Sequence, residues 1–130
     1  AKKLVKKLNG MGKAILGARI LVMGMTFKEN VADIRNSKVV DIINELKDFG
    51  VEVDVVDPYA DPEEVKKMYG FRLIEKPLGN YDAVVVAVAH DAYQGLDEKY
   101  FKSLTCDKAV LVDVKGMYRD KIHELKYWSL

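Results

Sequence analysis

Cysteine and histidine are scarce in this sequence. Its 130 residues include one cysteine, Cys106, and two histidines, His90 and His123. A single cysteine excludes a disulfide framework within the chain and fits a reducing compartment, so we expect a cytoplasmic protein. Because one cysteine and two widely separated histidines do not make a usual ligand set, we predict no metal site.

An excess of charge of one sign is also lacking, and so is any long apolar run. The 21 basic and 20 acidic side chains leave a net charge of +1, so no whole-molecule field attracts nucleic acid or a membrane. No stretch approaches the roughly 20 apolar residues that cross a bilayer, and no signal peptide is visible. The remaining composition, 49% hydrophobic and 32% charged, is typical of one soluble globular domain.

Apolar patterns indicate a series of strands. Four runs are unbroken or alternating, as in buried strands, and a fifth is brief. They lie at 18–24, 51–57, 83–89 and 109–113, with the brief one at 71–74. The run at 83–89 is apolar throughout, so we expect it in the middle of the sheet.

Helices are predicted between these strands. Apolar residues at helical spacing follow Ser37, a second helix is expected to start at Asp61, and a short third helix is marked by Leu96, Tyr100, Phe101 and Leu104. We expect Ser37 to cap the first helix and Gly50 to stop it. Pro62 after Asp61 and acidic residues in the first turn mark the start of the second.

Strands that alternate with helices imply right-handed crossovers between parallel strands. We therefore predict an α/β fold, a Rossmann-like doubly wound sheet of about five mainly parallel strands with helices on both faces. The end of the chain stays open: Ile122 and Leu125 favour a helix, whereas 126–130 could be extended. Ligands of such sheets bind beyond the carboxyl ends of the strands.

The segment 25–37, between the first strand and its helix, is the main candidate for a site. It is about twice as long as the usual 2–6 residues of such a connection, and long loops at this edge are often functional. Thr26, Lys28, Arg35 and Ser37 are the kinds of donor that a diphosphate needs. Alternatively, Arg35 pairs with Asp33 to hold the loop, and Lys28 is merely solvated.

A dinucleotide site is disfavoured in this loop. Only Gly24 is present, and Met25, Thr26 and Phe27 follow where a G-x-G-x-x-G fingerprint needs further glycines. Asp57 lies more than 30 residues after Gly24 rather than about 20, so we interpret it as turn chemistry with the proline that follows. We expect no bound cofactor in this chain.

Five blocks, in order, carry a family resemblance. They are Gly24-Met25-Thr26-Phe27-Lys28, Asp33-Ile34-Arg35-Asn36-Ser37, Val55-Val56-Asp57-Pro58-Tyr59, Ala87-Val88-Ala89-His90-Asp91 and Asp113-Val114-Lys115-Gly116. With these blocks the chain resembles the C-terminal, UDP-binding domain of the UDP-glucose/GDP-mannose dehydrogenase family. The residues of the first two blocks are most similar to those of members that act on UDP-N-acetylhexosamines.

The resemblance implies a role within a larger enzyme. Intact members oxidise C6 of a UDP-hexose or UDP-N-acetylhexosamine to the uronic acid with two NAD, for polysaccharide precursor synthesis. An N-terminal domain binds NAD, a central helical domain makes a homodimer or higher oligomer, and both are partners of the UDP-binding domain. The family's catalytic residues have no counterpart here, so this chain alone is expected to be inactive.

The resemblance also assigns roles to single residues. Phe27 and Lys28 match a pair that contacts the nucleotide sugar, and Lys115 matches a basic residue that reaches the same substrate. Many relatives have arginine at the position of Lys115. We therefore expect a contact from the compact charge of an ammonium group instead of the bidentate hydrogen bonds of a guanidinium group. Asp33, Arg35 and Ser37 match a block that is expected to shape the loop first and touch the UDP-sugar second, with Thr26 as a further candidate.

The first residues resemble the family's junction with its central domain. We assign 1–17 to the end of that helical connection and 18–130 to the UDP-binding Rossmann-like domain. Because the chain opens without Met and inside a helical pattern, we expect a piece of a longer protein. The lysines at 2, 3, 6, 7 and 13 are either the solvated face of this helix, which the apolar spacing favours, or an anion-binding patch.

Two single residues are expected to have structural roles, and two other functions stay open. His90 is expected to be a loop hydrogen-bonder with a site role as the alternative, and Cys106 a partly buried structural thiol. A stand-alone nucleotide-binding Rossmann sensor is the first alternative function; the absent glycine pattern argues against it. The second is an assembly domain without dehydrogenase activity.

Overall fold

The computed structural model describes Lys6 and residues 17–129. The helical connection expected over 1–17 lies outside the described residues, apart from Lys6 and Gly17. The elements are β1 (Arg19–Met23), α2 (Lys38–Asp48), β2 (Glu52–Val56), α3 (Pro62–Tyr69), β3 (Tyr81–Val86), the short 3-10 helix η1 (Asp91–Tyr93), α4 (Glu98–Leu104), β4 (Thr105–Asp113) and β5 (Lys126–Ser129).

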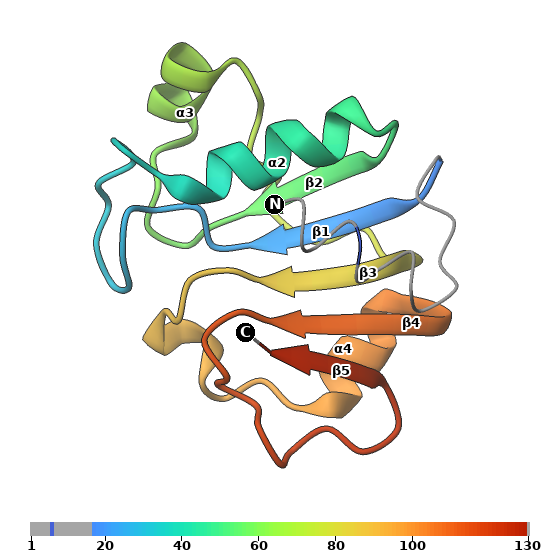
Figure 1. Cartoon of the computed structure of the whole chain (residues 1–130). Helices are drawn as coiled ribbons and strands as arrows, with labels where there is room; N and C mark the ends of the chain where they lie inside the picture. Colours follow the sequence, from blue (N-terminus) through green and yellow to red (C-terminus); the bar gives the residue numbers. More distant parts are fainter. Residues whose placement is uncertain (1–5, 7–16, 130) are drawn as a thin grey trace.

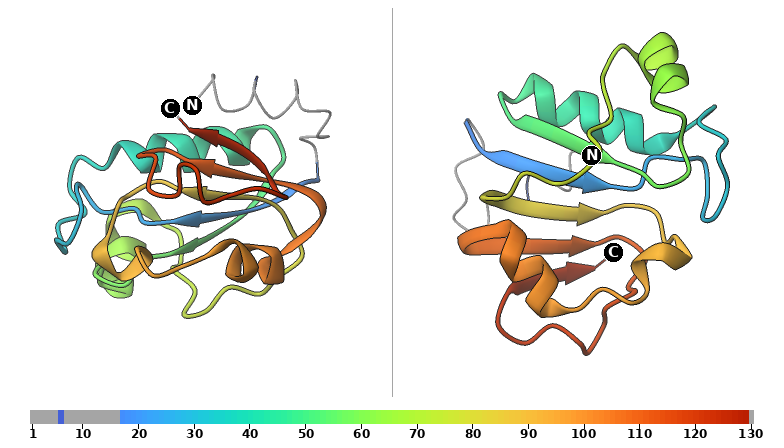
Figure 2. Two further views of the ribbon diagram at one scale, coloured as in Figure 1. Left: turned by 90° about the horizontal axis from the view of Figure 1, so that it is seen from below. Right: turned by 180° about the vertical axis from the view of Figure 1, so that it is seen from behind.

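The described strands form one parallel sheet in the order β2-β1-β3-β4-β5 (Figure 1). Helix α2 lies on one face and α4 on the other (Figure 2). The predicted α/β, Rossmann-like doubly wound fold is therefore confirmed. The central position expected for the run at 83–89 is confirmed too, because β3 is the middle strand.

Alternation along each strand divides the core into two layers. In β1, Val22 packs in the cluster that contains Ile43 of α2, whereas Leu21 packs in the cluster that contains Phe101 of α4. All four side chains are fully buried, which stabilises the fold by about 1.5–3 kcal/mol for each one. Because both faces of the sheet carry a core cluster, a ligand is expected at the carboxyl ends of the strands.

Helix α3 begins and ends as its sequence predicts. The Asp61 carboxylate accepts the backbone N–H of Glu63 at 2.9 Å, and Pro62 occupies the first turn, where its missing N–H costs nothing. Gly70 ends the helix in the left-handed conformation, with φ of 83°.

The brief strand expected at 71–74 does not form. A single ladder-like bond links this segment to the sheet, from the Ile74 N–H to the Val55 carbonyl at 2.9 Å. The chain bends directly afterwards, and Pro77 has no N–H with which to extend a ladder. The outer edge of β2 therefore keeps one bond where a strand would make several.

The helix suggested by Ile122 and Leu125 is also absent, and the extended alternative is correct as far as Ser129. Turns and bends fill 117–125. The Glu98 carboxylate accepts the N–H groups of His123, Glu124 and Leu125, at 2.7–3.1 Å. These amides are bonded to a side chain, so they are not available for the carbonyls of a helical turn.

Candidate functional site

The sheet reverses its strand order between β1 and β3, and all strands end at the same edge. β1 pairs with β2 on one side and with β3 on the other, so the chain leaves β1 in one direction and comes back to its other side. In open α/β sheets this switch point is where ligands bind, at the carboxyl ends of the strands.

A hollow of about 450 Å³ lies at this edge. Its walls come from the β1 loop, the first turns of α2, the end of β3 and the turn after β4. The lining residues are Thr26, Phe27, Lys28, Glu29, Asn36, Lys38, Val39, Ile42, Ala87, Val88, Val114 and Lys115. The structure therefore brings together four of the residues singled out in the sequence, namely Thr26, Phe27, Lys28 and Lys115.

The charge of this hollow is positive. Lys28, Lys38 and Lys115 line it with one carboxylate, that of Glu29. None of the three ammonium groups forms an ion pair with another residue in the described part of the chain. Unpaired cations that converge on one concave surface attract an anion, because their mutual repulsion is relieved when the anion binds.

The N-terminus of α2 adds to this field, but not in the way that the sequence suggested. Ser37 occupies the capping position, yet its hydroxyl donates to the Met25 carbonyl at 2.6 Å and accepts nothing from the helix. The expected side-chain cap is therefore wrong. The Ser37 side chain is thus bonded to the loop, and no described side chain caps the first amides of α2, where an anion is favoured.

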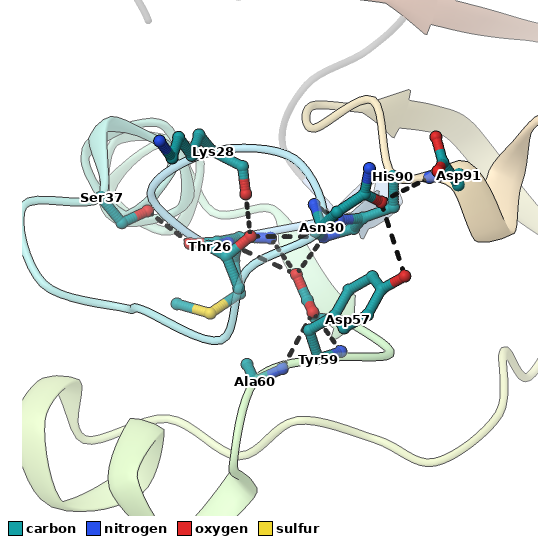
Figure 3. Close-up of polar contacts among 10 residues, drawn as sticks. Thr26, Lys28, Asn30, Ser37, Asp57, Tyr59, Ala60, His90 and Asp91 are labelled. Carbon is teal, nitrogen blue, oxygen red and sulfur yellow. Dashed lines mark hydrogen bonds and ion pairs between the residues drawn. The ribbon is translucent and has the colours of Figure 1, made fainter.

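A buried polar cluster holds the β1 loop beneath the hollow (Figure 3). His90 contacts the Asp57 carboxylate, the Thr26 hydroxyl and the Asn30 N–H. The Lys28 side chain points away from this cluster, while its carbonyl accepts from the Thr26 hydroxyl at 2.9 Å. The loop is thus fixed by its backbone and its small polar groups, and its cation is left exposed.

Asp57 is the centre of that cluster. Its Oδ1 accepts the N–H groups of Tyr59 and Ala60, which is the turn chemistry expected from the sequence. Its Oδ2 accepts the N–H groups of Met25 and Thr26, at 2.8 Å and 3.3 Å. The fully buried carboxylate therefore joins the end of β2 to the start of the β1 loop.

Arg35 lies apart from the lysines. Its guanidinium pairs with the Asp33 carboxylate through two contacts of 3.1 Å, and the Arg35 N–H also bonds it at 2.9 Å. Hydrogen bonding to Arg35 lowers the pKa of Asp33 from its ordinary value, and the pKa of Arg35 is raised in turn. Both residues line a different hollow, with Glu64, Lys67 and others.

The turn after β1 makes a close backbone contact at Gly24. The backbone at Gly24, with φ of 89°, lies so close to Val88 that a Cβ there would stand 2.7 Å from the Val88 Cβ. Met25 and Thr26 are buried beneath the loop. Gly24 thus serves the contact between β1 and the end of β3, and the backbone offers no glycine cradle for a pyrophosphate.

Sequence reasoning missed Lys38, Asn30 and the wider role of Asp57. Lys38 stands in the first turn of a helix that faces the loop, which could have placed it at the site. The bonds of Asp57 to residues 31 to 33 positions away leave no local pattern. The expectation for His90 as a loop hydrogen-bonder is confirmed by its contact with Asn30.

Two further observations concern the described residues only. None of their helices is long and apolar enough to cross a membrane. Within the same residues, no group of three or more His, Cys, Asp or Glu side chains could hold a metal ion. Cys106 is partly buried, as expected, and its thiol lies 3.3 Å from Asp82 Oδ1.

Comparison with known proteins adds a family to this geometry. Residues 21–120 match the UDP binding domain of the UDP-glucose/GDP-mannose dehydrogenase family. UDP-N-acetyl-D-glucosamine 6-dehydrogenase of Salmonella typhi is 36% identical over 88% of the chain. Protein CapL of Staphylococcus aureus is 42% identical over 90% of it. The chain spans only 27% and 28% of the length of these two relatives.

A solved structure has the same fold. The NDP-N-acetyl-D-galactosaminuronic acid dehydrogenase of Methanosarcina mazei Go1 superposes with a TM-score of 0.82 over 98% of this chain. The chain matches 27% of that protein's length, at 23% identity. The likeness therefore concerns one domain of a larger protein.

Proposed function

Because the chain belongs to the UDP-glucose/GDP-mannose dehydrogenase family, we propose that it binds the UDP part of the substrate in an NAD-dependent UDP-sugar 6-dehydrogenase. The whole protein oxidises C6 of the sugar to a carboxylate. NAD and the catalytic residues belong to its other domains, through which it also forms a dimer or larger assembly. This chain by itself binds nucleotide and oxidises nothing.

The observation that carries this proposal is the meeting of Lys28 and Lys115. The first follows β1 and the second follows β4, 87 positions later, yet both line one hollow. Each ammonium offers a compact positive charge with three donors, which suits the oxygens of a diphosphate. With Lys38 and Glu29 the hollow carries three positive charges and one negative charge, which balances a diphosphate diester.

The remaining candidates take supporting roles. Phe27 is 55% exposed at the hollow and offers an apolar face to the uracil or the sugar. The hydroxyls of Thr26 and Ser37 donate to backbone carbonyls of the loop itself. Asp33 and Arg35 bond each other, so we assign them to the shape of the loop before any contact with the ligand.

A UDP-N-acetylhexosamine is the substrate class that we favour. The relatives from Salmonella typhi and Pseudomonas aeruginosa are both named UDP-N-acetyl-D-glucosamine 6-dehydrogenase, at 36% and 37% identity. A relative from Rhizobium meliloti named UDP-glucose 6-dehydrogenase is 30% identical. No described observation favours the alternatives of a stand-alone sensor or an assembly domain.

Calorimetric titration of the chain with UDP tests the proposal. Lys28→Ala and Lys115→Ala should each weaken binding by about 1.5–3 kcal/mol, because each removes a charged hydrogen bond to phosphate. Lys67→Ala is the matched control, since Lys67 is an exposed lysine that lines another hollow. Equal affinities of all three variants and the parent chain would refute the site, as would tighter binding of NAD than of UDP.

A further inference from the structure

His90 is fully buried, and both nitrogens of its ring are engaged. Nδ1 lies 3.0 Å from the Asn30 N–H, which can only donate. Nδ1 therefore carries no proton, and the proton of the neutral ring is on Nε2. Nε2 lies 3.0 Å from Asp57 Oδ2 and 3.3 Å from the Thr26 hydroxyl oxygen, both of which accept.

The two loop residues that His90 contacts stand at the ends of one short segment. Thr26 opens it and Asn30 closes it, and the three residues between them, 27–29, all line the positive hollow. Asn30 has a φ of 62°, a left-handed conformation that asparagine adopts more readily than most residues other than glycine. Its Oδ1 accepts the Asp91 N–H at 2.8 Å, so Asn30 is bonded to the end of β3 twice.

The surroundings leave the ring little freedom. The Tyr59 ring lies 4.7 Å from it and the Tyr93 ring 5.4 Å, centroid to centroid. Asp57 is the charged group that faces the ring, and its carboxylate fixes the proton on Nε2. The His90 ring is fully buried while Asn30 is exposed, so the bond between Nδ1 and the Asn30 N–H lies at the edge of the buried cluster.

We propose that His90 is a positioning residue for the diphosphate site. Its Nδ1 holds the Asn30 N–H and thereby keeps segment 26–30 in the shape that presents Phe27 and Lys28 to the ligand. The role rests on the proposed function for its effect on affinity, although the shape of the loop can be observed without any ligand.

Two substitutions test the contributions of the two ring nitrogens separately. In His90→Asn, the amide oxygen takes the place of Nδ1 and can still accept from Asn30. In His90→Gln, the amide takes the place of Nε2, so it can still donate to Asp57 but leaves the Asn30 N–H without a partner. His123→Gln alters an exposed histidine outside the hollow and is the control.

Titration with UDP gives the first readout. We expect His90→Asn to bind within about threefold of the parent chain and His90→Gln to bind about tenfold more weakly, since the part-buried hydrogen bond that fixes the end of segment 26–30 is lost. Urea unfolding of both variants separates this effect from stability, which should fall by similar amounts in the two. Equal losses of affinity in both variants would overturn the role of Nδ1.

Nuclear magnetic resonance gives a second readout that needs neither UDP nor a variant. In the parent chain the ¹⁵N shifts of the ring should report a proton on Nε2 alone; a proton on Nδ1 would overturn the proposal. In the variants, the amide signals of 27–30 should move in His90→Gln and stay near their parent positions in His90→Asn. If the parent chain bound no UDP, the proposed function would fail, and these shifts would still decide the role of His90.

Discussion

Two long segments of this domain, residues 24–37 after β1 and residues 117–125 in the later part of the connection between β4 and β5, use polar groups in opposite ways. In the first, Asp57 and His90 bond the loop from inside, and the Lys28 ammonium at the hollow has no ion-pair partner among residues 17–129. In the second, charged side chains of α4 bond to the segment. The Glu98 carboxylate accepts three backbone N–H groups, and Glu124 pairs with Lys102.

The difference distinguishes a binding loop from a structural one. In both, backbone N–H groups are bonded to side chains of other elements. What marks the first is that its Lys28 lines one hollow together with Lys38 and Lys115, and none of the three forms an ion pair within the described chain. Preorganised charge of this kind binds an anion without the cost of ordering the loop.

The largest effect on stability is expected from Gly24→Ala, which disrupts the contact between the start of the first loop and Val88 after β3. The new Cβ would lie 2.7 Å from the Val88 Cβ, at a φ of 89° that side chains rarely adopt. We expect a loss of about 2–5 kcal/mol in the free energy of unfolding, measured in urea.

Gly70→Ala is the control for that change. Its φ of 83° is similar, but no atom lies within 4 Å of its Cβ position. It should cost only the strain of the left-handed conformation, about 1 kcal/mol. Equal losses at both positions would show that the approach of Gly24 to Val88 is not tight.

A smaller effect is expected from Lys38→Ala, which extends the comparison to the first turn of α2. Lys38 lines the hollow with Lys28 and Lys115, but it stands on a helix instead of the fixed loop. We expect UDP binding to weaken by about 0.5–1 kcal/mol, with a shallower dependence of affinity on salt. Titrations at two salt concentrations measure both, and an unchanged affinity would remove Lys38 from the site.

The smallest effect is expected from Glu98→Gln, which tests the second loop. Backbone N–H groups, that of Leu125 foremost, lower the pKa of Glu98 from its ordinary value of 4.5. The charged form therefore stabilises the folded state above about pH 4.5, and this contribution is lost as the pH falls through the lowered pKa.

Unfolding of Glu98→Gln and the parent chain across this range provides the measurement. The parent chain should be more stable at neutral pH, and the two should converge in acid. UDP affinity should not change, because Glu98 does not line the hollow. A difference in stability that did not depend on pH would contradict the role of the carboxylate.

The sequence predicts the elements whose signals are local. Asp61, Pro62 and Gly70 mark both ends of α3, and the apolar run at 83–89 gives the central strand. The segment 71–74 has a strand's composition, but whether it pairs depends on the edge of β2. The turns at 117–125 depend on Glu98, which is more than 20 positions away.

The site is predictable in the same uneven way. Its donors in 25–37 and at Lys115 can be identified from their types and from the blocks around them. Their convergence on one hollow follows only from the parallel order of the strands. Ser37 shows the limit: a serine before a helix usually caps it, but here its hydroxyl donates to the Met25 carbonyl and accepts no N–H of the helix.

The central claim is that Lys28 and Lys115 share one diphosphate, and the ε-methylene signals of the lysines report it most directly. Each signal is assigned from its loss in the corresponding alanine variant and then followed as UDP is added. The account predicts that the Lys28 and Lys115 signals shift along one saturation curve with a single Kd, while the Lys67 signal stays in place and uridine without phosphate moves neither. Shifts of only one of the two lysines, or different Kd values for the two, would contradict it.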